Sequence, residues 1–116
     1  MFLPEEQLRI WLCLEPTDMR CSFDGLAARV RLRLQDDPLS GQLFVFVNRR
    51  RSHAKMLFFD RNGYCLWAKR LERGQFDVPF GDGVKKPLSL MALRMLIDGL
   101  VPRAFAQRRR YARGHP

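Results

Sequence analysis

The stretch that decides the fold, residues 54–71, reads AKMLFFDRNGYCLWAKRL. Two apolar runs rich in aromatic residues flank the dipeptide Asn62-Gly63. Both residues of that dipeptide accept the positive φ that a type I′ turn requires. The pattern predicts a β-hairpin whose two antiparallel strands cover residues 54–60 and 64–71.

The predicted turn also fixes a register between the two strands. With both loop residues at positive φ, we expect Phe58 directly opposite Trp67, and Phe59 opposite Leu66. The first pair shares one face of the sheet, and the second pair shares the other face. This register makes Trp67 a core residue rather than a platform on which a nucleic-acid base could stack.

Two further strands are predicted before the hairpin. Residues 8–14 (LRIWLCL) are short and mostly apolar, and Pro16 ends the run because proline lacks the N–H that a sheet ladder needs. Residues 43–47 (LFVFV) are apolar at consecutive positions, which is typical of a strand covered on both faces. We expect the first of these strands to join an edge of the sheet.

The segment between these two strands fits two interpretations. Its apolar residues from Phe23 to Leu34 follow the spacing of one helical face, whereas residues 29–34 (RVRLRL) alternate as in a strand. The length of the segment favours a helix over residues 24–35. Asp24 then lies at the positive end of the helix dipole, where a carboxylate is stabilising.

The rest of the chain adds a second helix and a short strand. Ser89 is expected to act as the N-cap of a helix over residues 90–98, with Gly99 at its C-terminal end. Residues 75–78 are expected to add a short fourth strand. The sequence therefore predicts an α+β fold, in which an antiparallel three- or four-stranded sheet around residues 43–78 carries two packed helices.

Length and charge narrow the function. The chain has 116 residues, with 21 Lys and Arg against 12 Asp and Glu, which gives a net charge of +9. We expect a single domain over residues 1–102 and an arginine-rich flexible tail over residues 103–116. This charge indicates an anionic partner, and nucleic acid before a membrane surface. Neither a membrane span nor a secretory signal is visible, so we expect no membrane association and a cytoplasmic location.

No metal or catalytic site is predicted. Cys13, Cys21 and Cys65 form no C-x-x-C pair, so we interpret them as small core or half-buried residues rather than zinc ligands. Converging aspartates would suit a metal-dependent nuclease, but several of these aspartates lie at predicted helix ends or turns, where they have local structural roles. We expect no cofactor, no metal and no catalytic residue, with a small nuclease kept as an alternative.

Clustered arginines form the candidate binding site. Guanidinium groups stay charged and bind phosphate oxygens in pairs, so such clusters suit polyanions; a solvated patch that only aids solubility is the alternative. We expect the arginines of the loop over residues 48–53 to be exposed, the tail to be mobile without a partner, and DNA binding to be weakly sequence-selective. The candidate phosphate contacts are Arg49, Arg50, Arg51, Arg103, Arg108, Arg109, Arg110 and Arg113.

A homodimer is also expected. Residues 43–47 and 56–59 are apolar on both faces of the predicted sheet, while only two helices are available to cover it. A second copy of the chain would close the rest. Two helices on opposite faces would serve the same purpose, so this alternative stays open.

Short motifs occur along most of the chain, between residues 6 and 102. They read TDMR at 17–20, FDGLA at 23–27, DPLSGQLFVF at 37–46, KML at 55–57, DRNGYCL at 60–66 and AKRLERGQF at 68–76. In this order they resemble the TnpB accessory proteins of bacterial insertion sequences of family sixty-six. The arginine-rich end lies outside the shared motifs.

The resemblance implies a role in DNA transposition beside a separate transposase, which carries the catalytic acids. It implies no enzymatic activity, and it supplies no catalytic residues to carry over. We therefore expect a non-catalytic accessory protein that binds DNA, the transposase or both. A pure protein–protein adaptor with an incidental basic surface is the alternative.

Overall fold

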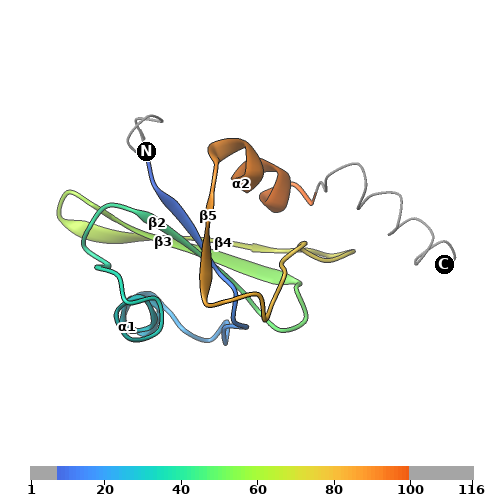
Figure 1. Ribbon diagram of the computed structural model, residues 1–116, viewed down its shortest axis with the longest axis horizontal. Coiled ribbons are helices and arrows are strands. Elements are labelled where there is room, and N and C mark those ends of the chain that lie inside the picture. Colours follow the sequence, from blue (N-terminus) through green and yellow to red (C-terminus); the bar gives the residue numbers. More distant parts are fainter. Residues whose placement is uncertain (1–7, 100–116) are drawn as a thin grey trace, which may run out of the picture.

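The computed structural model describes residues 8–99, which form a five-stranded sheet and two helices (Figure 1). The strand order across the sheet is β4-β3-β2-β1-β5. The predicted α+β class with two helices is confirmed. In chain order the elements are β1 (Ile10–Cys13), α1 (Phe23–Leu32), β2 (Leu43–Val47), β3 (His53–Asp60), β4 (Gly63–Arg70), β5 (Lys85–Leu88) and α2 (Leu90–Ile97).

The sheet is mixed rather than antiparallel, which corrects the prediction. β1 pairs in parallel with β2, while the other neighbouring strands pair antiparallel. Parallel neighbours need a crossover connection, and α1 supplies it between β1 and β2. The prediction that the first strand joins an edge is wrong, because β5 pairs with the other side of β1.

The strand at that edge is β5, which the sequence did not predict. Its residues Lys85-Lys86-Pro87-Leu88 include none of the β-branched or aromatic residues on which strand prediction relies. The predicted fourth strand over residues 75–78 is absent, and that segment is irregular chain whose Phe76 N–H donates to the Arg51 carbonyl. Phe76 and Val78 still contribute to the core, because both side chains are buried.

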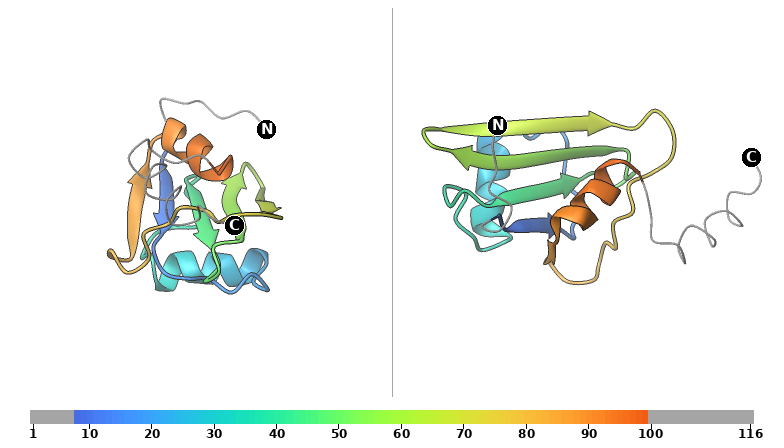
Figure 2. Two further views of the ribbon diagram at one scale, coloured as in Figure 1. Left: turned by 90° about the vertical axis from the view of Figure 1, so that its right-hand side faces the viewer. Right: turned by 90° about the horizontal axis from the view of Figure 1, so that it is seen from above.

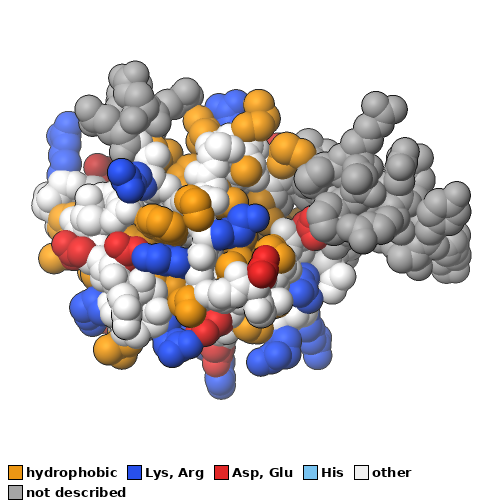
Figure 3. Space-filling view, in the orientation of Figure 1, with side chains coloured by type: hydrophobic (Ala, Val, Ile, Leu, Met, Phe, Trp, Pro, Cys, Tyr) orange, Lys and Arg blue, Asp and Glu red, His pale blue; other side chains and the backbone are white. Residues whose placement is uncertain are grey.

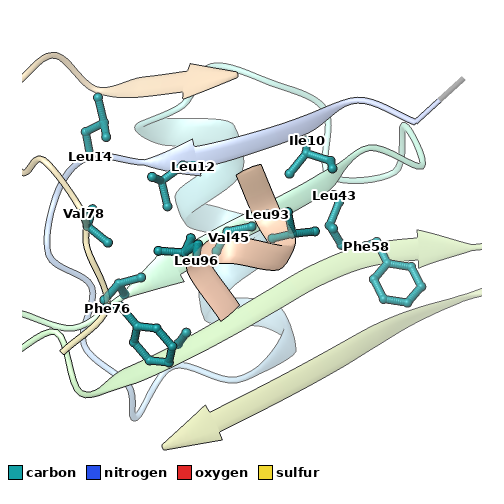
Figure 4. Close-up of a cluster of buried hydrophobic side chains, with 12 residues drawn as sticks. Ile10, Leu12, Leu14, Leu43, Val45, Phe58, Phe76, Val78, Leu93 and Leu96 are labelled. Atoms are coloured by element: carbon teal, nitrogen blue, oxygen red, sulfur yellow. The ribbon is translucent and has the colours of Figure 1, made fainter. Parts of the chain in front are cut away.

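Each face of the sheet is covered by one helix (Figure 2). All residues of β2 are buried, as predicted for a strand covered on both faces. Val45 packs in the cluster that contains Leu93 and Leu96 of α2 (Figure 4), whereas Phe44 and Phe46 pack against α1. The two helices thus lie on opposite faces, the arrangement that the sequence left open as the alternative to a second copy.

The hairpin forms, but its turn lies one residue earlier than predicted. Asp60 pairs with Gly63, so the two-residue loop is Arg61-Asn62. Arg61 has a φ of 58°, and the N–H of Asn62 donates to the carbonyl oxygen of Asp60 over 2.6 Å. Neither Asn62 nor Gly63 has the positive φ that the predicted type I′ turn requires.

The earlier turn changes the cross-strand partners without changing the faces. Phe58 lies opposite Cys65 instead of Trp67, and Phe59 lies opposite Tyr64. Moving the loop by one residue displaces each partner by two positions, and side chains two apart share a face. Phe58 and Trp67 therefore still share the α2 face of the sheet, where both belong to one core cluster.

Both predicted helices are confirmed, with small differences in length. α1 begins at Phe23, with Asp24 in its first turn, and it ends before the predicted residue 35. Gln35 has a φ of 53°, which no α-helix accommodates. Ser89 caps α2 as predicted, since its Oγ accepts the Ala92 N–H over 3.0 Å. Neither α1 nor α2, the helices found between residues 8 and 99, is long and apolar enough to cross a membrane.

Candidate nucleic-acid interface

The loop between β2 and β3 is held by one asparagine. The side-chain oxygen of Asn48 accepts the backbone N–H of Ser52 and of His53, over 2.9 and 3.0 Å. The backbone N–H of Asn48 donates to the His53 carbonyl, and its own carbonyl accepts the Arg51 N–H. These bonds fix the path of residues 48–53, so the arginines between them are presented from an ordered turn.

The three arginines of this loop differ in environment. Arg49 and Arg50 are exposed, as predicted. Arg51 is half-buried, which corrects the prediction that all three are exposed. Its Nε donates to the Val78 carbonyl over 3.1 Å, and its guanidinium carbon lies 4.4 Å from the centre of the Phe80 ring. Its charge is therefore directed at the 76–80 segment of its own chain.

A cleft of about 1240 Å³ opens beside Arg49 and Arg50. It is bounded by the chain after β1, by α1, by the β2–β3 loop and by the end of β4. We call it the basic cleft. Its lining residues are Pro16, Thr17, Asp18, Met19, Arg20, Arg29, Asn48, Arg49, Arg50, Ser52, His53, Arg70 and Leu71.

The basic cleft concentrates positive charge. Five of its lining residues are arginines and one is an aspartate, so with histidine neutral its formal charge is 5 − 1 = +4. On the face seen in Figure 3, Lys and Arg side chains lie among apolar ones. Sequence reasoning missed Arg20, Arg29 and Arg70, because each lies outside the arginine runs and only the fold brings them together.

The loop that carries Arg20 is anchored to the sheet. Lys55 of β3 donates its Nζ to the carbonyls of Met19 and Cys21, over 2.8 and 2.7 Å. The Arg20 guanidinium donates to both carboxylate oxygens of Asp18, with a shortest contact of 2.6 Å. This hydrogen bonding is the main reason that the pKa of Asp18 falls to about 2. Arg20 itself stays 92% exposed, so its outer surface is open to a ligand.

The other two arginines also contact acceptors of the protein. Arg70 Nε lies 3.1 Å from a carboxylate oxygen of Glu72. Arg29 donates to the Pro16 carbonyl over 3.0 Å and lies 3.8 Å from the Glu15 carboxylate. Hydrogen bonding from Arg33 lowers the pKa of Glu15. Within residues 8–99, the Arg29 Nε is a buried donor that has no partner.

Potential metal ligands do not cluster in the described part of the chain. Residues 8–99 contain no group of three His, Cys, Asp or Glu side chains that could hold a metal ion. Cys13 is buried and Cys21 and Cys65 are half-buried, as interpreted from the sequence, and all three are free thiols. Asp36, at the predicted helix stop, lies 2.5 Å from the Lys85 ammonium.

The remaining candidate contacts lie outside the described residues. The structure describes the chain as far as residue 99. Near this end, the Nζ of Lys69 in β4 donates to the carbonyl of Ile97, the last residue of α2, over 2.8 Å. The tail predicted over residues 103–116 therefore stays a prediction. Its candidate contacts are Arg103, Arg108, Arg109, Arg110 and Arg113.

Comparison with known proteins identifies similar chains. Residues 8–107 match the model of a family described as IS66 Orf2 like protein. A Sinorhizobium fredii protein named uncharacterized protein y4hO is 42% identical over 99 residues, which cover 84% of this chain and 86% of the relative. A second protein of that organism, uncharacterized protein y4jC, is 37% identical over 79 residues, covering 68% of each. No solved structure matches.

Proposed function

Because the chain belongs to the IS66 Orf2-like family of TnpB proteins, we propose that it is a non-catalytic accessory protein of insertion-sequence transposition that binds DNA through the basic cleft. Family membership associates the chain with transposition, and DNA binding is the finer step that we add. The protein would act in the bacterial cytoplasm beside a separate transposase.

The observation that carries this proposal is the convergence of five arginines on one cleft. Separate segments contribute Arg20, Arg29 and Arg70, in addition to Arg49 and Arg50 of the loop. Each phosphate that a protein neutralises releases condensed counterions from DNA, so several arginines aligned on one surface supply most of a non-specific affinity. The exposed partners of Arg20 and Arg70 are carboxylates, whose surface ion pairs are weak enough for phosphate oxygens to replace them.

The ordered loop adds to the expected affinity. Arg49 and Arg50 project from a turn that Asn48 closes with hydrogen bonds on both of its sides. A backbone that is already fixed loses less conformational entropy when its side chains bind, which favours the complex. The planar guanidinium groups can then donate in pairs to phosphate oxygens.

The composition of the basic cleft favours backbone recognition. None of its lining residues is Phe, Tyr or Trp, whereas five are arginines, whose guanidinium groups suit phosphate oxygens. Phosphate contacts position a protein on DNA but carry no sequence information. We therefore propose weakly selective binding to duplex DNA, with the arginines of the tail as additional phosphate contacts.

A salt series tests the proposal. Changing both Arg49 and Arg50 to alanine should weaken duplex binding and reduce the slope of log affinity against log salt by about 2, roughly one for each lost phosphate contact. The matched control is Arg61→Ala, an exposed arginine of the hairpin loop outside the basic cleft. If both variants keep the native affinity and slope, DNA binding through the cleft is wrong and the adaptor function stands in its place.

A further inference from the structure

The two outer strands of the sheet differ in how their free edges are protected. Just beyond the β1–β5 pairing, the Leu14 N–H donates to the Val84 carbonyl. This bond sets the alternation along β5: the backbone N–H and C=O groups of even-numbered residues point toward β1, and those of odd-numbered residues point away from the sheet. Pro87 is therefore at an outward position, where its missing N–H removes a donor from the free edge. β5 is also only 4 residues long, and both features block further strand pairing.

The edge formed by β4 has neither protection. β4 is 8 residues long and contains no proline. The Leu71 N–H donates to the Ser52 carbonyl, which sets the alternation along this strand. The backbone N–H and C=O groups of odd-numbered residues point toward β3, and those of even-numbered residues point away from it. The backbone groups of Tyr64, Leu66, Ala68 and Arg70 thus point outward from the sheet.

The side chains of β4 are also incompletely covered. None of its residues is buried, although Tyr64, Cys65, Leu66 and Trp67 follow one another along it. In contrast, every residue of β2 is buried. Half-buried apolar side chains on both faces of a long, proline-free strand that has no second neighbour within residues 8–99 are typical of a strand that pairs with another strand.

We propose that this edge pairs antiparallel with the same edge of a second copy of the chain, with Trp67 at the two-fold axis. This register pairs all four outward-facing residues, because Leu66 lies opposite the second copy's Ala68 and Tyr64 opposite the second copy's Arg70. It places Lys69 opposite the second copy's Cys65. Within β4 no two like charges face each other, so this strand is complementary to itself.

Such pairing has a consequence for the basic clefts. The two-fold axis of an antiparallel pair within one continuous sheet runs perpendicular to that sheet, so the α1 faces of both copies lie on the same side. Arg70 and its copy would be separated by six residue steps, about 20 Å along the strands. This inference rests on β4 alone and stands whether or not the clefts bind DNA.

Amide hydrogen exchange on the full chain tests this proposal without any substitution. When the edge is paired, the amides of Tyr64, Leu66, Ala68 and Arg70 should exchange slowly at high protein concentration and faster on dilution. Light scattering should give about twice the chain mass of 13.7 kDa under the first condition. A monomer at every concentration, or a dimer in which these four amides exchange freely, would overturn the proposal.

A variant pair gives a second test. Ala68→Pro removes an N–H that points away from β3, so β3 pairing stays intact while edge pairing is blocked. Ala68→Thr keeps the N–H at the same exposed position and should dimerise as the native chain does. Monomeric Ala68→Pro beside dimeric Ala68→Thr supports the interface, whereas equal dimerisation of the two contradicts it. If Ala68→Pro does not fold, the exchange pattern of the native chain decides.

Discussion

The guanidinium of Arg51 lies over the Phe80 ring, 4.4 Å from its centre, and thereby joins the β2–β3 loop to a segment nearly thirty residues further along the chain. The same residue has a φ of 59°, and its carbonyl accepts the Phe76 N–H over 2.7 Å. One residue of the arginine run thus stabilises the fold, while its two neighbours carry their charge outward.

This division predicts different effects of alanine substitution. Arg51→Ala loses a charge-assisted hydrogen bond and a cation–π contact, and should lower the free energy of unfolding by about 1–3 kcal/mol. Arg50→Ala, at an exposed neighbouring position, should change it by less than about 0.5 kcal/mol. Urea denaturation of both variants measures the difference. Equal stability of the two would contradict the structural role of Arg51.

Asp18 is expected to limit DNA affinity, because it is the single carboxylate among the residues that line the basic cleft and it pairs with Arg20. Asp18→Asn should raise affinity for duplex DNA roughly two- to fivefold, the size expected for removing one nearby like charge in high-dielectric surroundings. Asp82→Asn removes an exposed carboxylate outside the cleft and serves as the control. If both variants bind equally, the position of Asp18 has no special effect.

The ion pair of Asp18 also predicts a pH dependence. Hydrogen bonds from Arg20 lower the pKa of Asp18 from its usual 3.8 to about 2. A depressed pKa in the folded state means that the pair stabilises the fold above about pH 4, and that this contribution is lost as the pH falls toward 2. An NMR titration of the Asp18 carboxyl carbon measures the midpoint directly. In Arg20→Ala the midpoint should return toward the usual value, and an unchanged midpoint would contradict the assigned cause.

A substitution at Gly63 tests the observed hairpin turn, and Gly41, which lies before β2, serves as the control with a positive φ. Gly63 has no positive φ, and a Cβ added to it would meet no atom within 4 Å, so Gly63→Ala should be neutral or slightly stabilising. Gly41 has a φ of +86°, and Gly41→Ala should cost about 1 kcal/mol or more. Thermal denaturation of both variants compares them. Greater destabilisation by Gly63→Ala would favour the type I′ turn at Asn62-Gly63 that the sequence predicts.

The hairpin illustrates how far hydrophobic patterning specifies a structure. A two-residue loop within residues 54–71 assigns Phe58 and Trp67 to one face, and that assignment is confirmed. The hydrophobic pattern does not distinguish two turns that differ by one residue, because both leave every side chain on the same face. The turn was therefore the part of this hairpin that required the structure.

The missed strand and the missed arginines have different physical reasons. β5 is specified by its partner β1 and by the edge position that tolerates Pro87, and not by local β propensity. Arg20 and Arg70 lie 50 positions apart in the sequence, and only the packing of β4 near the chain after β1 brings them to one cleft. The helices were predictable from local signals, which are the apolar spacing of α1 and the Ser89 cap of α2.

DNA binding by the basic cleft requires contacts at particular residues, which chemical-shift mapping measures directly. Titrating a short duplex into the isotope-labelled full chain should perturb the amides of residues 17–20, 48–53 and 70–71 first, and added salt should reverse the change. The amides of β5 and α2 serve as internal controls and should remain at their free positions. Perturbations confined to β5 and α2, or no perturbation at low salt, would contradict DNA binding by the basic cleft.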